Sequence, residues 1–269
     1  MSQSEESKIK PDSSNETVSD EGKVNPVAQP PVLSDHILPP NLFVLPVNNA
    51  VVFPTLMVPI MVTQPRFIAT VEEAINRQRL LGLLLVKEGE VNEKTRPGDL
   101  YSVGVVVKIL KRLKMPDGSV NLLVHSMKRF QVLKTLSDHP HIVVETKYLD
   151  DKVEKSAEMD ALSRTVISSV KRLSEVNPFF TDEMRLAMLN APGPGTVADL
   201  VSFAISLPRA EAQAILESIE VKERFTKLLL HLKREGDVAE LQKKIHDDVN
   251  TKINTMQREF FLKEQLKAI

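Results

Sequence analysis

The chain has 269 residues, an apolar fraction of 42% and a net charge of −1, which allows one or two domains with hydrophobic cores. It contains no Cys, so disulfides, thiolate metal sites and thiol catalysis are excluded. Aromatic residues make up 4% of the chain, and no apolar run approaches the ~20 residues of a membrane-spanning helix. We therefore expect aliphatic cores and no membrane partner.

The first segment of the chain differs in charge from the rest. Residues 1–40 carry 3 basic and 7 acidic side chains and few large apolar ones, which predicts a disordered acidic tail. They lack the apolar core of a signal peptide, so a cytoplasmic location is expected. Residues 41–150 carry 14 basic and 10 acidic side chains, an excess too mild to indicate a nucleic-acid partner.

Residues 41–150 predict a compact, mostly antiparallel β-domain with one helix, over Gln64–Arg79. The expected strands are 42–47, 51–53, 56–62, 81–86, 100–113, 120–126, 129–136 and 142–149. Pro46, Pro54 and Pro59 interrupt the first runs. Because proline removes a ladder donor, these strands are expected to be edges, bulged or bent, which suits a small barrel better than a flat sheet.

Two glycines in this domain carry structural expectations. Gly104 interrupts the strand 100–113 and is expected at a bulge or at a close approach of another backbone. In the turn Met115–Ser119, Pro116 presets φ and Gly118 takes the positive φ that a tight reversal needs.

Residues 151–235 have helical periodicity throughout and predict a helical bundle. One helix is expected to end at Asn177-Pro178, and Thr181 is expected to cap the next. Ala191–Gly195 is expected to be a rigid connector. Thr196 and Asp199 have the spacing of a capping box, which predicts that they open the helix that runs to Leu207.

Residues 236–269 predict one long helix, and Gly236 is expected to mark a kink before it. Its apolar residues recur at steps of 3 or 4 and share one face: Val238, Leu241, Ile245, Val249, Ile253, Met256 and Phe260. The sequence remains helix-forming to Ile269 without a Gly or Pro stop. We expect a chain that is the front part of something longer, and the alternative is a terminal helix that packs on a partner.

Motifs for catalysis and cofactor binding are missing from the sequence. There is no Gly-x-x-x-x-Gly-Lys-Ser/Thr loop, so no ATP site is expected within these residues. His139-Pro-His141 predicts an exposed turn and not a metal site. Ser168–Lys171 matches Ser-x-x-Lys by chance, because it lies in an amphipathic helix without an oxyanion loop. We expect no catalytic residue, cofactor or metal in this chain.

Two clusters in the β-domain suggest a binding function. Basic residues gather on the predicted hairpin: Lys108, Lys111, Arg112 and Lys114. They could contact RNA, but no aromatic stacking pair accompanies them, which favours a solvated strand edge. Methionines are also concentrated here: Met57, Met61, Met115 and Met127. Either they fill gaps in the core, or they form an adaptable surface that holds unfolded polypeptide.

Three separated segments, in the right order, resemble the N-terminal region of the Lon protease family. Leu45–Ile60 is similar to the opening of its N-terminal domain, and so is Gly98–Leu110 with the turn Pro116–Gly118 after it. Gln257–Ile269 looks like the segment that enters the ATPase module. The departures, at Asn48-Asn49, His125-Ser126 and Phe260-Phe261, affect only local contacts.

This resemblance implies a PUA-like β-barrel followed by helices, in an α+β chain. It also implies a cytoplasmic, homohexameric, ATP-dependent serine protease of protein quality control and the stress response, which degrades misfolded and short-lived regulatory proteins. The catalytic dyad and the ATP and Mg²⁺ sites of such a protease are expected outside these 269 residues.

On this reading the chain recognises substrate and organises the oligomer. We expect the methionines Met57, Met61, Met115 and Met127 to contact unfolded or damaged protein. The stripe from Leu241 to Phe260 is expected to be the association surface, and weak sites in a ring gain avidity. Two alternatives remain at this stage. One is a free-standing substrate-binding adaptor without a protease, and the other is a PUA-like RNA-binding module.

Overall fold

The computed structural model describes residues 38–48, 51–174, 182–205 and 207–267, with side chains excepted at 182–185 and 259–267. Contacts divide the chain into two units, Met1–Leu38 and Pro39–Ile269. The tail expected over residues 1–40 therefore lies outside the described residues apart from its last three. Everything that follows concerns the second unit.

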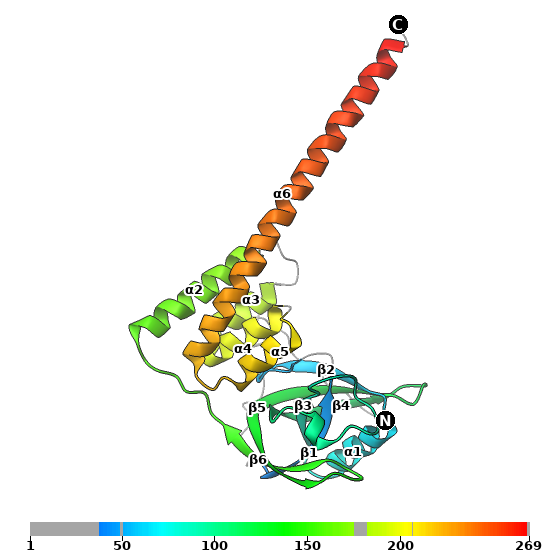
Figure 1. Ribbon diagram of the computed structural model, residues 1–269, viewed down its shortest axis with the longest axis vertical. Helices are drawn as coiled ribbons and strands as arrows, with labels where there is room; N and C mark the ends of the chain where they lie inside the picture. The colour runs from blue at the N-terminus through cyan, green and yellow to red at the C-terminus, as the bar shows by residue number, and fades with distance from the viewer. Residues whose placement is uncertain (1–37, 49–50, 175–181, 206, 268–269) are drawn as a thin grey trace, which may run out of the picture. The chain divides into compact units, whose positions relative to one another are not determined.

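The second unit has a six-stranded sheet followed by helices, which confirms the mixed α+β class (Figure 1). Its strands are β1 (Asn41–Val47), β2 (Met57–Val62), β3 (Leu80–Leu85), β4 (Val103–Lys114), β5 (Val120–Ser137) and β6 (Val143–Leu149). Helix α1 (Pro65–Asn76) lies between β2 and β3, and the 3₁₀ helix η1 (Pro97–Asp99) precedes β4. Buried Leu, Val and Ile side chains form most of the core, as the composition predicts, and Phe53, Phe67, Phe130 and Phe225 add buried rings that the prediction of an aliphatic core did not include.

The strand order is β2-β5-β4-β3-β1-β6, and β5 also pairs with β6. The pairings β5-β4-β3-β1-β6-β5 therefore form a closed circuit, and β2 lies outside it. Only the pairing of β1 with β3 is parallel, so the sheet is mostly antiparallel as expected. The PUA-like classification of this sheet stays a prediction.

Strand β5 corrects the prediction of two strands at 120–126 and 129–136, because it runs unbroken through both. It pairs with β2 from Val120 to His125 and with β6 from Arg129 to Ser137. On the β4 side, Met127 lies between paired neighbours and has no partner, which makes it a bulge. A bulge bends a strand without ending it, and for this reason one strand can serve both neighbours.

The predicted strand at 51–53 is also wrong, since Val51–Phe53 is irregular. Val51 and Phe53 are nevertheless buried, at 8% and 1% exposure. A short apolar run reports burial, and burial by itself does not distinguish a strand from a buried loop.

Pro46 and Pro59 lie where a strand lacks a second neighbour, whereas Pro54 lies in a turn outside the described strands. Pro59 is in β2, which pairs with β5 alone among the described strands. Pro46 pairs with Leu84 of β3, but the pairing of β1 with β6 is confined to Asn41–Phe43. Neither proline therefore leaves a gap in a two-sided ladder, and the expectation of edge positions is confirmed.

Gly104 is a point of close approach and not a bulge. A Cβ placed on it would lie 2.0 Å from the carbonyl oxygen of Leu83. The register shifts of β4 occur instead at Val106/Val107 and Ile109/Lys111. Of the two alternatives predicted for Gly104, the close approach is therefore confirmed. Gly118 has φ +84° in the turn between β4 and β5, also as predicted.

Five helices follow the sheet within the described residues: α2 (Ala157–Ser174), α3 (Asp182–Leu189), α4 (Pro194–Ala204), α5 (Arg209–Glu217) and α6 (Val221–Lys267). Across the described residues, no helix has both the length and the apolar character that crossing a membrane requires. The expected ends at Asn177-Pro178 and Thr181 lie outside the described residues. The helical character of this segment is confirmed, and its description as a bundle stays a prediction.

Helix α4 begins earlier than the capping-box prediction requires. Its first residue is Pro194 and its N-cap is Gly193, so the last two residues of the expected connector, Pro194 and Gly195, are already helix. Thr196 and Asp199 therefore lie within α4 and do not cap it. The Asp199 side chain is 2% exposed and binds arginines from other elements, as described below.

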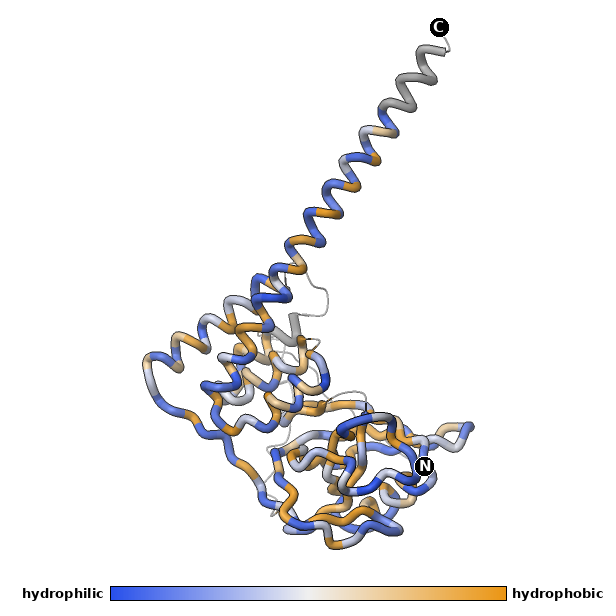
Figure 2. Tube along the Cα trace, viewed as in Figure 1, coloured by the Kyte–Doolittle hydropathy of each residue, from blue (hydrophilic) through white to orange (hydrophobic). Residues whose placement is uncertain are grey.

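Helix α6 is a single helix of 47 residues that continues through Gly236. Its first turns are buried through Val221, Phe225, Leu228 and Leu232. Gly236 faces α2, because a Cβ there would lie 3.2 Å from Nη2 of Arg172. In Figure 2 apolar residues continue to recur along the described turns beyond this point.

Candidate functional site

An apolar pocket of about 340 Å³ lies along β2. All five consecutive residues from Val58 to Val62 line it. Because successive strand residues point to opposite faces, a pocket that touches each of them lies at the edge of the strand. The end of β1, Leu45–Val47, also lines the pocket. This part of β1 lies beyond the pairing with β6, which covers only Asn41–Phe43. We call this pocket the β2 groove.

Residues from three other elements complete the β2 groove. Phe67 of α1 is buried, Val91 comes from the loop before η1, and Phe203 of α4 is 45% exposed. Each of the residues that line the groove is uncharged. The groove therefore offers apolar contact and a few neutral polar groups, which is the usual character of a binding pocket.

The first turn of α1 positions the loop that contributes Val91. Arg66 donates from Nη1 to the carbonyl oxygens of Glu93 and Thr95, at 2.9 and 3.0 Å. Gln64 donates from Nε2 to the carbonyl oxygen of Val91 at 3.5 Å. Charged donors make the stronger hydrogen bonds, so Arg66 is the main restraint on this wall of the groove.

The structure places all four predicted methionines along the β2–β5 pair. Met57 and Met61 project from β2 and are 64% and 65% exposed. Met115 lies in the turn that leads into β5, and Met127 occupies the bulge of β5; both are half-buried. Gap-filling in the core therefore does not describe Met57 and Met61. Their role in substrate contact stays a prediction, and only Met61 lines the β2 groove.

The register adds further apolar residues to the outer side of β2. Met61 is opposite Asn121 of β5, and Asn121 is opposite Leu113 of β4, which is 62% exposed. In the next row Pro59 is opposite Leu123, and Leu123 is opposite the exposed Lys111. Directly paired residues share a face, so the exposed Met61 and Leu113 lie on the same face with Asn121 between them, and Lys111 marks the charged limit of the neighbouring row.

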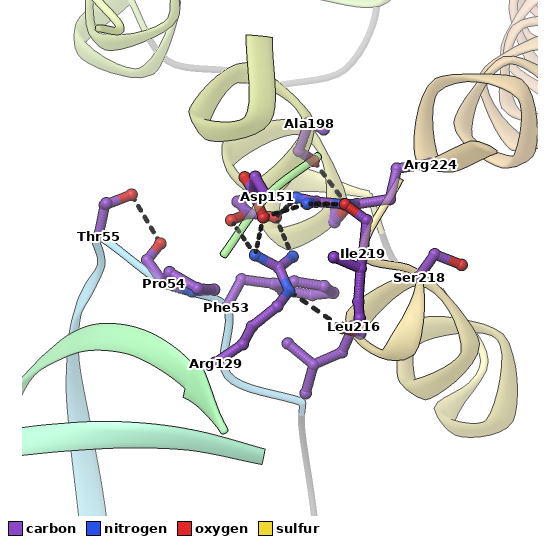
Figure 3. A network of polar contacts seen from close by, with 12 residues as sticks. Phe53, Pro54, Thr55, Arg129, Asp151, Ala198, Leu216, Ser218, Ile219 and Arg224 are labelled. Carbon is purple, nitrogen blue, oxygen red and sulfur yellow. Dashed lines mark hydrogen bonds and ion pairs between the residues drawn. The ribbon is translucent and has the colours of Figure 1, made fainter. Parts of the chain in front are cut away.

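A second site, which is polar, is buried between the sheet and the helices (Figure 3). Arg129 of β5 donates from Nη1 to Oδ2 of Asp199 at 2.9 Å, and its Nη2 contacts Oδ1 of the same carboxylate. Arg224 of α6 donates from Nη1 to Oδ1 of Asp199 at 3.1 Å, and its Nη2 pairs with Asp151. These residues form the ionic joint: Arg129, Asp151, Asp199 and Arg224.

The ionic joint connects four segments that are distant in sequence. It links β5, the segment that contains Asp151 after β6, α4 and α6. The side chains of Arg129, Asp199 and Arg224 are each 3% exposed or less. Arg129 also donates from Nε to the carbonyl oxygen of Leu216 in α5, at 3.0 Å. Burial raises the pKa of Asp199, and the hydrogen bond and charge of Arg129 oppose this shift.

The chemistry of this joint is structural. Two guanidinium groups face two carboxylates, so the buried charges are balanced. Gly195 allows the carboxylate of Asp151 to approach α4, since a Cβ there would lie 2.0 Å from Oδ2 of Asp151. Both carboxylates are held by arginines, and among the described residues they belong to no group of three or more His, Cys, Asp or Glu side chains that could hold a metal ion.

The joint and the groove meet through α4. Asp199 enters the joint, and Phe203, four residues later on the same helix, lines the groove. Positions i and i+4 lie one above the other on a helix face. The position of α4, which the joint holds, therefore decides where the Phe203 ring stands relative to β2.

The predicted association stripe on α6 is exposed wherever its side chains are described. Exposure is between 46% and 66% at Leu241, Ile245, Val249, Ile253 and Met256. The side chain of Phe260 lies outside the described residues. An exposed apolar stripe on a helix is typical of an association surface, and this role stays a prediction.

The basic residues of the β4–β5 hairpin are partly paired. Arg112 and Lys114 form ion pairs with Glu72 of α1, at 3.4 and 3.0 Å. Their contact lowers the pKa of Glu72, chiefly through the hydrogen bond from Lys114. These two residues therefore serve contacts within the chain, and the absence of a nucleic-acid partner stays a prediction.

The remaining sequence candidates are Ser168, His139 and His141. Ser168 donates to the carbonyl oxygen of Thr165 in its own helix, at 2.9 Å. His141 contacts Thr70 through Nδ1 at 2.9 Å, and His139 is exposed. Over the ranges the structure describes, no group of three His, Asp or Glu side chains could hold a metal ion.

Sequence reasoning missed Phe203 and the whole ionic joint. A signal existed for Asp199, since it is a single charge within the apolar run Val197–Ala204. A charge at such a position is buried with a partner more often than left alone. No comparable signal identifies which arginines would reach it.

Comparison with known proteins gives a consistent family. The ATP-dependent protease La (LON) substrate-binding domain matches residues 41–234. The Lon protease of Leptospira interrogans serogroup Icterohaemorrhagiae serovar copenhageni is 39% identical over 236 residues, which are 87% of this chain and 28% of that protein. The Lon protease of Treponema pallidum is 35% identical over 236 residues, 87% of this chain and 27% of that protein. The chain thus spans little more than a quarter of the relatives it matches.

Solved structures show the same fold. The N terminal domain of Mycobacterium avium complex Lon protease has a TM-score of 0.58 at 22% identity, over 72% of this chain and 98% of that one. The Lon N-terminal domain protein from Xanthomonas campestris has a TM-score of 0.51 at 18% identity, over 71% and 97%. The mixed α+β architecture is therefore shared with these domains.

Proposed function

The chain belongs to the Lon protease family, with residues 41–234 as its substrate-binding domain, and we propose that it captures unfolded or damaged protein on the outer side of β2. The observation that carries this proposal is the exposure of Met57 and Met61 beside an uncharged groove. Methionine side chains adapt to apolar partners of different shapes, which suits a surface without strict sequence preference.

The direct test is binding of a permanently unfolded protein to the 269-residue chain. Fluorescein-labelled reduced and carboxymethylated lactalbumin is the probe, and fluorescence anisotropy gives the Kd. Replacing Met57 and Met61 together by Ser is expected to weaken binding roughly ten- to hundredfold, since about half of the 1.5–3 kcal/mol of each buried Met side chain would be lost.

The matched control is Leu189→Ser on α3. Leu189 is 62% exposed, close to the exposure of the two methionines, but it does not line the groove. Its replacement is expected to leave the Kd unchanged. Equal weakening by both changes would mean that any exposed apolar residue suffices, and the proposed site on β2 would be wrong.

We further propose that α6 organises an oligomer, a hexamer in the whole protein. The support is the exposed stripe on its described turns and the lack of charge along it. Ile245→Asp with Val249→Asp is expected to reduce the mass measured by light scattering without changing the helical signal in circular dichroism. An unchanged mass would contradict this role for the stripe.

The remaining parts of the proposal concern the whole protein. Its relatives are named Lon protease, so we propose an ATP- and Mg²⁺-dependent serine endopeptidase of the cytoplasm that removes misfolded and short-lived regulatory proteins. The closed circuit of strand pairings supports a PUA-like barrel for the β-domain. The test uses the whole protein and fluorescent unfolded casein. Degradation of the casein is expected to require ATP and to stop when the β2 groove is mutated.

A further inference from the structure

Among the described strands β2 pairs only with β5, so the backbone groups on the edge of β2 that faces the groove have no strand partner within the described residues. Ser126 of β5 donates its N–H to the carbonyl oxygen of Leu56, so the backbone of Leu56 points toward β5. Backbone direction alternates along a strand, as the side chains do. Val58, Ile60 and Val62 therefore also point toward β5, and Met57, Pro59 and Met61 point away from it.

Pro59 supports this assignment independently. The ladder with β5 continues on both sides of it, from Val58 opposite Val124 to Ile60 opposite Leu122. A proline in a continuous ladder has to lie where its missing N–H would have pointed away from the partner strand. The free edge thus presents the N–H and C=O of Met57 and Met61, but only the C=O of Pro59.

The groove lies against this same edge. Its lining includes Val58–Val62 on one side and Leu45–Val47 on the other, and none of its lining residues is charged. A charged side chain placed there would lose its water shell without gaining an ion partner, which is costly. An occupant that uses both the edge and the groove is therefore an extended backbone with uncharged side chains.

We propose that β2 binds an extended, uncharged segment of an unfolded polypeptide as an added strand, with its apolar side chains in the β2 groove. The proposal rests on the proposed function and adds the way in which substrate is held. Backbone hydrogen bonds at Met57 and Met61 provide affinity that is independent of sequence, and the groove selects against charge.

Pro59 sets a limit on this pairing. The added strand finds one donor fewer than a regular edge would offer, so the contact is short and reversible. The same gap discourages the β2 edges of two chains from pairing with each other, because proline on an edge strand interrupts such a ladder. An edge that holds a substrate briefly and does not aggregate is suited to handing that substrate on.

Two labelled peptides separate strand addition from general apolar contact. The first is a nine-residue peptide of alternating Leu and Thr. The second has the same sequence with N-methyl groups on two adjacent central residues, which blocks both edges of its backbone and keeps its side chains. We expect the methylated peptide to bind the 269-residue chain at least tenfold more weakly in anisotropy titrations.

The outcomes of this comparison are distinct. Equal binding of both peptides would overturn strand addition and leave apolar capture of substrate intact. Binding of neither peptide, together with no binding of unfolded lactalbumin, would overturn the proposed function as well. Preference for the unmethylated peptide supports the proposal.

A matched pair of variants at Met61 locates the effect. Met61→Pro removes an edge N–H that points away from β5, so the β2–β5 ladder remains, and it should weaken binding of the unmethylated peptide more than Met61→Ala does, because it removes a backbone donor as well as the side chain. Met61→Ala keeps the N–H and removes the side chain, so binding should weaken while the difference persists. If Met61→Pro does not fold by circular dichroism, the peptide pair on the unmodified chain decides the question.

Discussion

The ionic joint and the β2 groove both reverse the usual pattern of a globular protein, in which apolar side chains are buried and charged side chains are exposed. The joint buries charge, with Arg224 at 0% and Asp199 at 2% exposure, whereas the groove exposes apolar side chains, with Met61 at 65%. Buried charges cost solvation energy, and they are retained where geometry has to be fixed. Covering an exposed apolar side chain is favourable because it removes apolar surface from water, so such side chains mark a contact surface.

This difference separates a rigid region, the joint, from an adaptable region, the groove. Each charge of the joint has defined partners at hydrogen-bond distance, so α4 and α6 have one arrangement relative to β5. The groove has flexible methionine side chains and an unpaired strand edge, so it can accept varied segments. One region therefore fixes the wall against which the other receives its ligand.

The largest expected effect comes from removing the central anion of the joint. Asp199→Asn leaves the guanidinium groups of Arg129 and Arg224 buried without their shared carboxylate, and it should reduce the free energy of unfolding by about 3–5 kcal/mol. Urea unfolding followed by circular dichroism measures the change. The control is Asp150→Asn, whose carboxylate is 84% exposed and pairs with Lys128, and the expected loss there is at most about 1 kcal/mol. Similar losses in both variants would mean that the joint does not hold the segments together.

A smaller effect is expected from crowding the joint without changing its charge. Gly195→Ala places a Cβ 2.0 Å from Oδ2 of Asp151, so the carboxylate has to shift away from Arg224, at about 1–3 kcal/mol. Gly193→Ala is the matched change two residues earlier, since a Cβ there meets nothing within 4 Å. Thermal unfolding of both variants should separate them clearly. Equal melting temperatures would indicate that Asp151 contributes little.

The joint and the groove are expected to be coupled through α4, because Asp199 of the joint and Phe203 of the groove both belong to this helix. Phe203→Ala should weaken binding of unfolded lactalbumin about fivefold, because about 1 kcal/mol of apolar contact is lost. Asp199→Asn should produce a loss of similar size if the joint positions Phe203, and the double variant should be no worse than either single one. Additive losses in the folded variants would show that groove and joint act independently.

The smallest effect concerns the surface beside the groove. Burial, and secondly the charge of Lys108, lower the pKa of His125, which is opposite Met57 in the register. As the pH falls below the ordinary histidine value of about 6.5, the unfolded chain therefore takes up a proton before the folded chain does, and stability declines. His125→Gln should remove this part of the decline in urea titrations between neutral and mildly acid pH. An identical pH profile in the variant would contradict the assignment.

Much of the chain could be predicted from local sequence because periodicity and turn chemistry act over a few residues. The alternation of β-type runs and the turn at Gly118 gave the strand content of residues 41–150, and helical spacing gave the helices after 150. The prolines correctly indicated edges, because a missing N–H excludes a two-sided ladder wherever it occurs. Gly104 was identified as a special position, although only Leu83 in space explains it.

The errors share one cause, which is that the deciding partner is distant in sequence. Val51–Phe53 has the composition of a strand but is buried as a loop. The capping spacing of Asp199 is local, whereas its two arginines lie 70 and 25 residues away and bind the carboxylate more strongly than a backbone N–H would.

The order of elements, the aliphatic part of the core, the family resemblance and the apolar stripe of α6 can all be inferred from the sequence alone, since each follows from patterns within one segment. Only the tertiary structure decided that β2 lies outside the strand circuit, that Met57 and Met61 are exposed, and that Phe203 stands beside them. The reason is physical. An edge, a groove and a buried ion pair are relations between segments, and their free energies depend on neighbours that no local pattern specifies.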